Sequence, residues 1–180
     1  MYKRQGLFIV LNTNNYNAAE HAQTIEEATK AYPDAAWRIV TIHQDIYGSG
    51  YDHSDTDGMI LRTQLTPIFD QYDIDVVLQG HDHTYSRTKL LYGDGQTHDS
   101  YSMPLNEDGT DYDWDHAQNV ATGELYTLWP EEGDAAGQAS KQAFVEGNQC
   151  YTIEDTTGNT VVNPEGTLYM TANSASGSKF

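Results

Sequence analysis

The amino-acid sequence predicts an α/β fold, in which helices cover a largely parallel sheet. In the first half of the chain, three short apolar segments of strand length alternate with two segments of helical periodicity. This β-α-β-α-β order is typical of layered domains with crossover helices. Histidines directly follow the second and third predicted strands, at the edge where open α/β sheets place their ligands.

The first strand and the first helix lie at the start of the chain. Residues 6–11 form an apolar run of strand length. Asn17 can accept hydrogen bonds from the free amides of a helix over residues 18–32, and Pro33 would end that helix. Small and apolar side chains give the helix one face for packing: Ala18, Ala22, Ile25, Ala28 and Thr29.

A second strand over residues 37–43 ends at His43, and its nearly continuous apolar centre is typical of a strand buried on both faces. A polar loop over residues 44–57 follows. Apolar side chains at helical spacing then predict a second helix, in which Pro67 marks a kink or an irregular turn: Met59, Ile60, Leu65, Ile68 and Phe69.

A third strand over residues 75–79 completes this first half, and the second half has a different composition. Residues 93–147 carry much of the acidic excess, are rich in Asp, Gly and Tyr, and show little periodicity. We expect an acidic insertion there, beside the functional site, with short strands around residues 124–128. Residues 149–154 and 167–171 alternate like strands that return to the sheet.

Composition limits the possible functions. The 180 residues fit one domain, which we predict over residues 6–180. With 27 Asp and Glu against 9 Lys and Arg, the net charge of −18 repels phosphate backbones and anionic lipids, so we expect no nucleic-acid and no membrane partner. No apolar run approaches the ~20 residues of a spanning helix. Cys150 is the only cysteine and cannot form an internal disulfide.

Both ends of the chain look like the interior of a domain. The apolar run at residues 6–11 has no capping segment before it, and only a Ser- and Gly-rich turn follows the strand at residues 167–171. We therefore expect a truncation at both ends, which would leave sheet edges and apolar faces for other sequence to cover.

The candidate metal ligands are His43, His81 and His83. Neutral imidazole suits Zn, Fe or Mn, and a His-x-His pair on a turn can aim two rings at one small volume. Gly80 would permit that turn. Histidines at strand ends that simply face solvent are the alternative.

Two ordered blocks of the sequence resemble a known family. The stretch Gly80-His-Asp-His-Thr-Tyr-Ser-Arg87 resembles the GHxH segment of calcineurin-like metallophosphoesterases, especially its Gly-His-x-His-x-Tyr-x-Arg form in purple acid phosphatases. Residues 37–43, with Tyr47 and Tyr51-Asp-His53, are similar to the family's strand-end histidine and its histidine-bearing loop. The resemblance covers residues 8–89 and, more loosely, 166–179. It implies the C-terminal portion of a layered α-β-β-α catalytic domain.

The resemblance implies hydrolysis of a phosphate ester, as a phosphatase or phosphodiesterase, at a dinuclear centre of Fe, Zn or Mn. His43 and His81 would ligate one ion and His83 the other, beside a bridging carboxylate. Two such cations turn bound water into a nucleophile for attack on phosphorus. His53 would protonate the leaving alcohol or hold the phosphate, because an ordinary histidine pKa near ~6.5 suits proton transfer; a solvent-facing loop histidine is the alternative. Where the family can carry a neighbouring histidine, this chain has Asp52.

The sequence departs from the family in what it lacks. The family's Asp-bearing strand end, its Gly-Asp turn with the bridging carboxylate and its Gly-Asn-His segment are absent upstream of Gly6. Neutral imidazoles alone do not offset the charge of two cations. We therefore expect the chain by itself to bind at most one divalent ion weakly and to hydrolyse little or nothing. Acidity and family habit predict a secreted or extracellular protein.

A secreted, acidic, calcium-dependent binding module is the alternative function. Asp111, Asp113 and Asp115 alternate as in a calcium loop, but His116 and Thr122 stand where an EF-hand requires Gly and Glu. A solvated acidic loop is therefore favoured. Several aromatic residues of the insertion would line a cleft or simply pack: Tyr101, Tyr112, Trp114, Tyr126 and Trp129. His21, His98 and His116 are interpreted as surface histidines.

Overall fold

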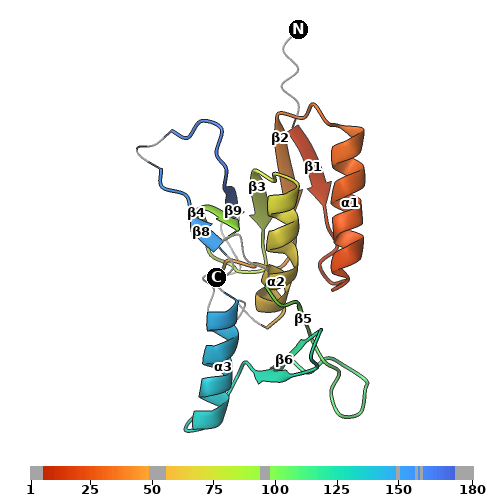
Figure 1. Cartoon of the computed structure of the whole chain (residues 1–180), viewed down its shortest axis with the longest axis vertical. Coiled ribbons are helices and arrows are strands. Elements are labelled where there is room, and N and C mark those ends of the chain that lie inside the picture. Colours follow the sequence, from red (N-terminus) through yellow and green to blue (C-terminus); the bar gives the residue numbers. More distant parts are fainter. Residues whose placement is uncertain are drawn as a thin grey trace.

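A six-stranded mixed sheet forms the centre of the molecule (Figure 1). The computed structural model describes residues 6–48, 56–93, 98–148, 151–156, 158 and 160–172. The strand order is β1-β2-β3-β9-β4-β8. Their bounds are β1 Gly6–Val10, β2 Trp37–Thr41, β3 Val76–Gln79, β4 Ser86–Gly93, β8 Tyr151–Ile153 and β9 Thr167–Thr171. Strands β1, β2, β3 and β9 are parallel, whereas β4 is antiparallel to both of its neighbours. The predicted α/β class and the two returning strands are confirmed.

Helices α1 (Ala18–Ala31) and α2 (Thr56–Gln71) cover one face of the sheet. The core between these layers is buried and apolar: Ile9, Ile25, Val40, Leu61, Leu65, Phe69, Val77, Leu91 and Tyr169. On the opposite face, Phe8 and Val10 are 65% and 74% exposed, because neighbouring side chains of a strand point to opposite faces. Among the described residues, no helix is both long enough and apolar enough to cross a membrane.

The first helix begins and ends as the sequence predicts. The Asn17 side chain accepts hydrogen bonds from the amides of Ala19 and Glu20, and the helix ends before Tyr32. In α2, by contrast, the irregular turn expected at Pro67 does not form, and the helix continues through that residue to Gln71. Pro67 is exposed, and the apolar side chains packed on both sides of it stabilise the helix more than local propensity destabilises it.

The acidic segment after β4 forms a second, smaller sheet and a helix. Strands β5 (Tyr101–Ser102), β6 (His116–Asn119) and β7 (Leu125–Thr127) form a small antiparallel sheet, and α3 (Ala135–Gly147) packs against it. A second core joins this unit to α2: Ile60, Tyr101, Met103, Ala117, Leu128 and Phe144. The sequence did not predict α3, because the apolar stripe of this helix is narrow and only Gly137 and Phe144 are buried.

Candidate metal-binding site

His43 and His81 lie against each other at the carboxyl ends of two neighbouring strands. Because β2 and β3 are parallel and adjacent, their last residues reach the same edge of the sheet. The Gly80 amide donates a hydrogen bond to the His43 carbonyl at 3.0 Å. The centroids of the His43 and His81 rings are 5.1 Å apart, at an interplanar angle of 68°. Two of the predicted ligands therefore converge, while their binding of a metal stays a prediction.

The turn that carries His81 is sharp. His81 has a φ of 69°, and the Asp82 amide donates to the Gly80 carbonyl across it at 2.8 Å. This is a γ-turn with a left-handed central residue, a conformation that L-residues adopt only at a cost. A tight turn follows Gly80, as the sequence predicts, but the positive φ within it belongs to His81 and not to the glycine. A Cβ at Gly80 would stand 3.4 Å from the His43 carbonyl oxygen, which is an ordinary van der Waals contact.

The structure says less about the other two predicted residues, His83 and His53. His83 is exposed and follows the buried Asp82 in the sequence. His53 lies outside the residues that the structure describes, so its proposed role stays a prediction. The metal ligation proposed for His83 also stays a prediction.

Asp45, Gln79 and Thr171 form a buried polar cluster, in which Asp45 follows His43 by two residues and Gln79 precedes His81 by two. Their exposed fractions are 1%, 7% and 1%. The Gln79 amide and the Thr171 hydroxyl both donate to the Asp45 carboxylate. Burial raises the pKa of Asp45 to about 6; the negative charge of Asp82 adds to this effect, while the Thr171 hydrogen bond and the Arg62 charge oppose it.

A second set of bonds fixes the loop next to His43. The Thr13 hydroxyl, after β1, accepts from the His43 amide at 3.3 Å and donates to the Gln44 side chain. The Arg62 guanidinium, from α2, donates to the carbonyl of Ile46 and lies 4.7 Å from the centroid of the Tyr47 ring. The loop is thereby bound to the segment after β1 and to α2. Local sequence signals do not reveal these contacts, because the partners are far apart in the chain.

The donors in the described part of the chain are too few for a dinuclear centre. Across the described part of the chain, no group of three or more His, Cys, Asp or Glu side chains is placed to hold an ion. The His43 and His81 rings offer two neutral ligands, and neutral ligands alone do not hold two cations together. The described residues therefore do not fit a dinuclear centre without further, anionic ligands.

The insertion is attached beside this edge of the sheet. Trp129 donates to the Thr56 hydroxyl at 2.8 Å, and Thr56, at the start of α2, donates to the Trp114 carbonyl. Tyr112 packs edge-on against Tyr16 of the β1–α1 loop, with ring centroids 5.6 Å apart. Tyr101 and Tyr126, by contrast, pack with Phe144 in the second core.

The structure also places His21 and the acidic loop around His116. His21 is 4% exposed, with Nε2 2.7 Å from the Asn15 carbonyl, so its interpretation as a surface histidine is wrong. The ring turns inward because the α1 face that meets the sheet includes position 21 as well as Ile25.

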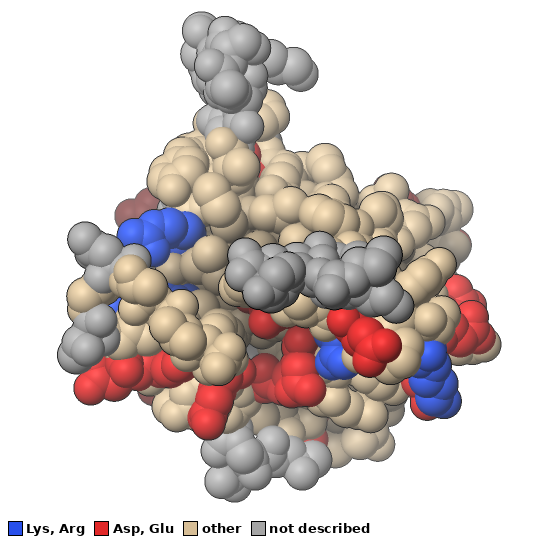
Figure 2. All heavy atoms as spheres, turned by 90° about the horizontal axis from the view of Figure 1, so that it is seen from above, with Lys and Arg blue, Asp and Glu red and all other residues tan. Residues whose placement is uncertain are grey.

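In the acidic loop, the Asp113 carboxylate is 2.9 Å from Nδ1 of His116. Acidic side chains form several groups on the face shown in Figure 2, between a few Lys and Arg side chains.

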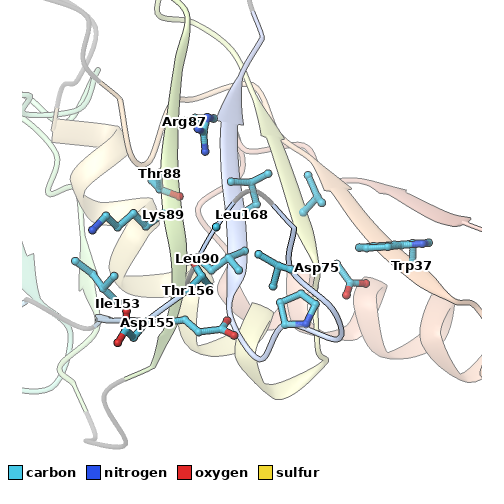
Figure 3. A pocket seen from close by; sticks show the side chains of 15 residues that line it. Trp37, Asp75, Arg87, Thr88, Lys89, Leu90, Ile153, Asp155, Thr156 and Leu168 are labelled. Atoms are coloured by element: carbon cyan, nitrogen blue, oxygen red, sulfur yellow. The ribbon is translucent and has the colours of Figure 1, made fainter.

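A concavity lies away from the histidines (Figure 3). It has a volume of about 680 Å³ and is lined by the first residues of β2 and β3, by β4 and by the segment after β8. Trp37 and Asp75 mark its position at the amino ends of the parallel strands, whereas the histidines follow the carboxyl ends. The pocket is therefore distinct from the candidate metal-binding site.

Short sequence similarities connect the chain to purple acid phosphatases. It is 38% identical over 58 residues to a purple acid phosphatase of Glycine max and, over the same length, to Fe(3+)-Zn(2+) purple acid phosphatase 12 of Arabidopsis thaliana. An uncharacterized protein of Mycobacterium tuberculosis is 37% identical over 57 residues. These matches cover 32% of this chain and 11–12% of the length of these curated relatives. No protein-family model matches the chain. About a third of the chain is therefore similar to a metallophosphoesterase.

Proposed function

We propose that the chain is the C-terminal portion of a metal-dependent phosphoric ester hydrolase, similar to purple acid phosphatases. The observation that carries the proposal is the contact of His43 with His81, whose ring centroids are 5.1 Å apart at the ligand-binding edge of a parallel sheet. Two imidazoles from separate strands that meet at such an edge are the arrangement expected of ligands to one ion. The short matches to purple acid phosphatases support the same reaction class.

In this proposal, His43 and His81 ligate one ion of an Fe, Zn or Mn centre, His83 ligates the other, and His53 protonates the leaving alcohol or contacts the phosphate. The anionic ligands that a dinuclear centre requires would come from outside the described residues. The isolated chain would then hydrolyse little or nothing. The substrate would be a phosphate ester, with nucleic acids and anionic membranes repelled by the net charge of −18. A secreted or extracellular location is proposed from the same acidity.

Hydrolysis of a chromogenic phosphomonoester by a longer protein, extended upstream in its reading frame, tests this proposal. We expect turnover that depends on added Mn, Zn or Fe. His81→Ala should reduce kcat/KM by more than about 100-fold, because even residues that only orient a metal ligand contribute about 10- to 100-fold. His116→Ala is the matched control, since that ring pairs with Asp113 in the insertion.

Absence of turnover with any of these metals would overturn the enzyme proposal. The alternative, a calcium-dependent binding module, makes a different prediction. Its folding would require calcium and would be indifferent to a chelator selective for transition metals.

A further inference from the structure

We propose that Gln79 is a positioning residue for the histidine pair: through the buried polar cluster with Asp45 and Thr171, it holds the His43 and His81 rings in contact. This inference rests on the proposed function, which assigns metal binding to the His43–His81 pair. The placement of the rings can nevertheless be measured without a metal.

The cluster adds side-chain hydrogen bonds between three segments that already meet in or beside the sheet. Gln79 ends β3, Asp45 lies in the loop after β2, and Thr171 ends β9. Asp45 and Thr171 are 126 positions apart in the chain, yet the Thr171 hydroxyl donates to the Asp45 carboxylate. The cluster therefore fixes the carboxyl end of β3 relative to the loop after β2, between the strands that carry the two histidines.

Gln79 uses both ends of its side-chain amide in this arrangement. Its Oε1 accepts from the Ile46 amide at 3.2 Å. Its Nε2 donates to the Asp45 carboxylate and lies 3.3 Å from the Tyr47 carbonyl and 3.4 Å from the Thr171 hydroxyl. One side chain thus binds three consecutive residues, 45–47, of the loop that begins immediately after His43. A buried amide with this many partners is held in a single orientation.

Both histidines are within two residues of the cluster. Gln79 precedes Gly80 and His81, and Asp45 follows His43 by two positions. His81 has a φ of 69°, a backbone conformation that persists only where the surrounding structure enforces it. The cluster fixes the residue before this γ-turn, and the Gly80 amide bond to the His43 carbonyl fixes the turn itself. Loss of Gln79 should therefore let the two rings separate.

A general contribution to stability is the competing explanation, and Gln64 provides the matched control. Gln64 has the same 7% exposure, and its Nε2 donates to the Tyr101 carbonyl at 2.7 Å, on the side of α2 that faces the second core. Gln79→Met and Gln64→Met both replace a buried amide by an apolar side chain of similar length. Both variants should lower the unfolding midpoint, but only Gln79→Met should affect the histidine pair.

The test is the nuclear Overhauser cross peak between the ring protons of His43 and His81 in the isolated, metal-free chain. We expect a cross peak in the unchanged protein and in Gln64→Met, and its loss or marked weakening in Gln79→Met. An unchanged cross peak in Gln79→Met, its absence from the unchanged protein, or equal weakening in Gln64→Met would overturn the proposal. If Gln79→Met does not fold, Thr171→Val decides: the cross peak should weaken, and an unchanged one would overturn the proposal.

A titration with Co²⁺, followed by its visible absorption, separates this inference from the proposed function. If the pair binds the ion, Gln79→Met should weaken binding about 10- to 100-fold relative to Gln64→Met, as expected for a residue that orients a ligand. If neither the unchanged chain nor its variants bind Co²⁺, but the cross peak depends on Gln79, the positioning role stands. Support for metal binding by the pair is then lost. If the unchanged chain binds and Gln79→Met binds equally well, the positioning role fails.

Discussion

His81 is a half-buried residue with an unfavourable backbone conformation. Its φ of 69° lies in the left-handed region, which costs an L-residue roughly 1–2 kcal/mol relative to glycine. Such conformations cluster at functional sites, where the surrounding structure enforces them. The local sequence places a histidine after the strand, but it does not reveal the positive φ of that residue.

This strain can be measured with a pair of substitutions. His81→Gly should give a free energy of unfolding about 1 kcal/mol higher than His81→Ala, because only glycine accepts the positive φ without penalty. The same pair at His83, which has no positive φ, should show the opposite order. Urea unfolding of the four variants measures both differences. Equal stability of the two His81 variants would contradict the strained turn.

Asp70 gives a pH dependence whose sign follows from burial. Desolvation raises the pKa of this α2 carboxyl above its ordinary value of 3.8, and a hydrogen bond from the Gly93 backbone partly opposes the shift. The folded protein therefore holds the proton to higher pH than the unfolded chain does. Consequently, the contribution of Asp70 to the free energy of unfolding falls as the pH rises from about 4 through the raised pKa.

Asp70→Asn should remove this decline. The difference in unfolding free energy between Asp70→Asn and the unchanged protein should grow in favour of the variant as the pH rises from about 4. The exposed Asp34→Asn controls for the loss of one negative charge. Urea unfolding across the acidic range provides the measurement, and a pH-independent difference would show that Asp70 is not desolvated.

At the scale of elements, helix α1 is specified by its own residues. The Asn17 Oδ1 atom accepts from the Ala19 amide at 3.2 Å and from the Glu20 amide at 3.4 Å, which satisfies donors that the helix leaves free. The sequence predicts this cap and the end of the helix near Pro33 correctly. Helix α3 shows the limit of such signals, because Asp134 caps it but its apolar stripe is too narrow to be recognised.

The cap gives a direct prediction. Asn17→Ala should lower the free energy of unfolding by about 0.5–2 kcal/mol, whereas Asn17→Gly should cost only a few tenths of a kcal/mol. Denaturant titration of both variants tests the effect. If Asn17→Ala matched the unchanged protein, the cap would contribute nothing to stability.

At the scale of the whole molecule, the sheet is covered unequally. Helices α1 and α2 bury one face, while Phe8, Val10 and Trp37 are exposed on the described surface. Among the strands that the structure describes, β1 also lies at an edge of the sheet and pairs on one side only. Apolar surface and an open edge together favour association with other chains, against the repulsion that a net charge of −18 provides.

The double substitution Phe8→Ser and Val10→Ser should therefore reduce self-association at high salt, where charge repulsion is screened. The free energy of unfolding should change little, because both side chains already face solvent. Ile9→Ser, at a position that is 4% exposed, should instead destabilise the fold severely. Sedimentation velocity and denaturant titration measure the two effects. If the double variant associated as the unchanged protein does, the face that carries Phe8 and Val10 would not be the self-association surface.

Much of the architecture follows from patterns that act over a few residues. Apolar runs predict β1, β2 and β3, and periodicity and capping predict α1 and α2. Once β2 and β3 are predicted, the sequence also places His43 and His81 just after them. These features could be predicted because strand and helix periodicity are local physical constraints. The position of Asp45, Gln79 and Thr171 as one buried cluster could not.

Tertiary structure alone placed β9 between β3 and β4, and with it Thr171 beside Asp45. It also turned His21 inward and gave His81 its left-handed backbone. The sequence by itself determined which segments become strands and helices, and which histidines stand at the strand ends. Only the fold decided which polar groups are desolvated together, because hydrogen bonds between residues 34 to 126 positions apart leave no periodic signal along the chain.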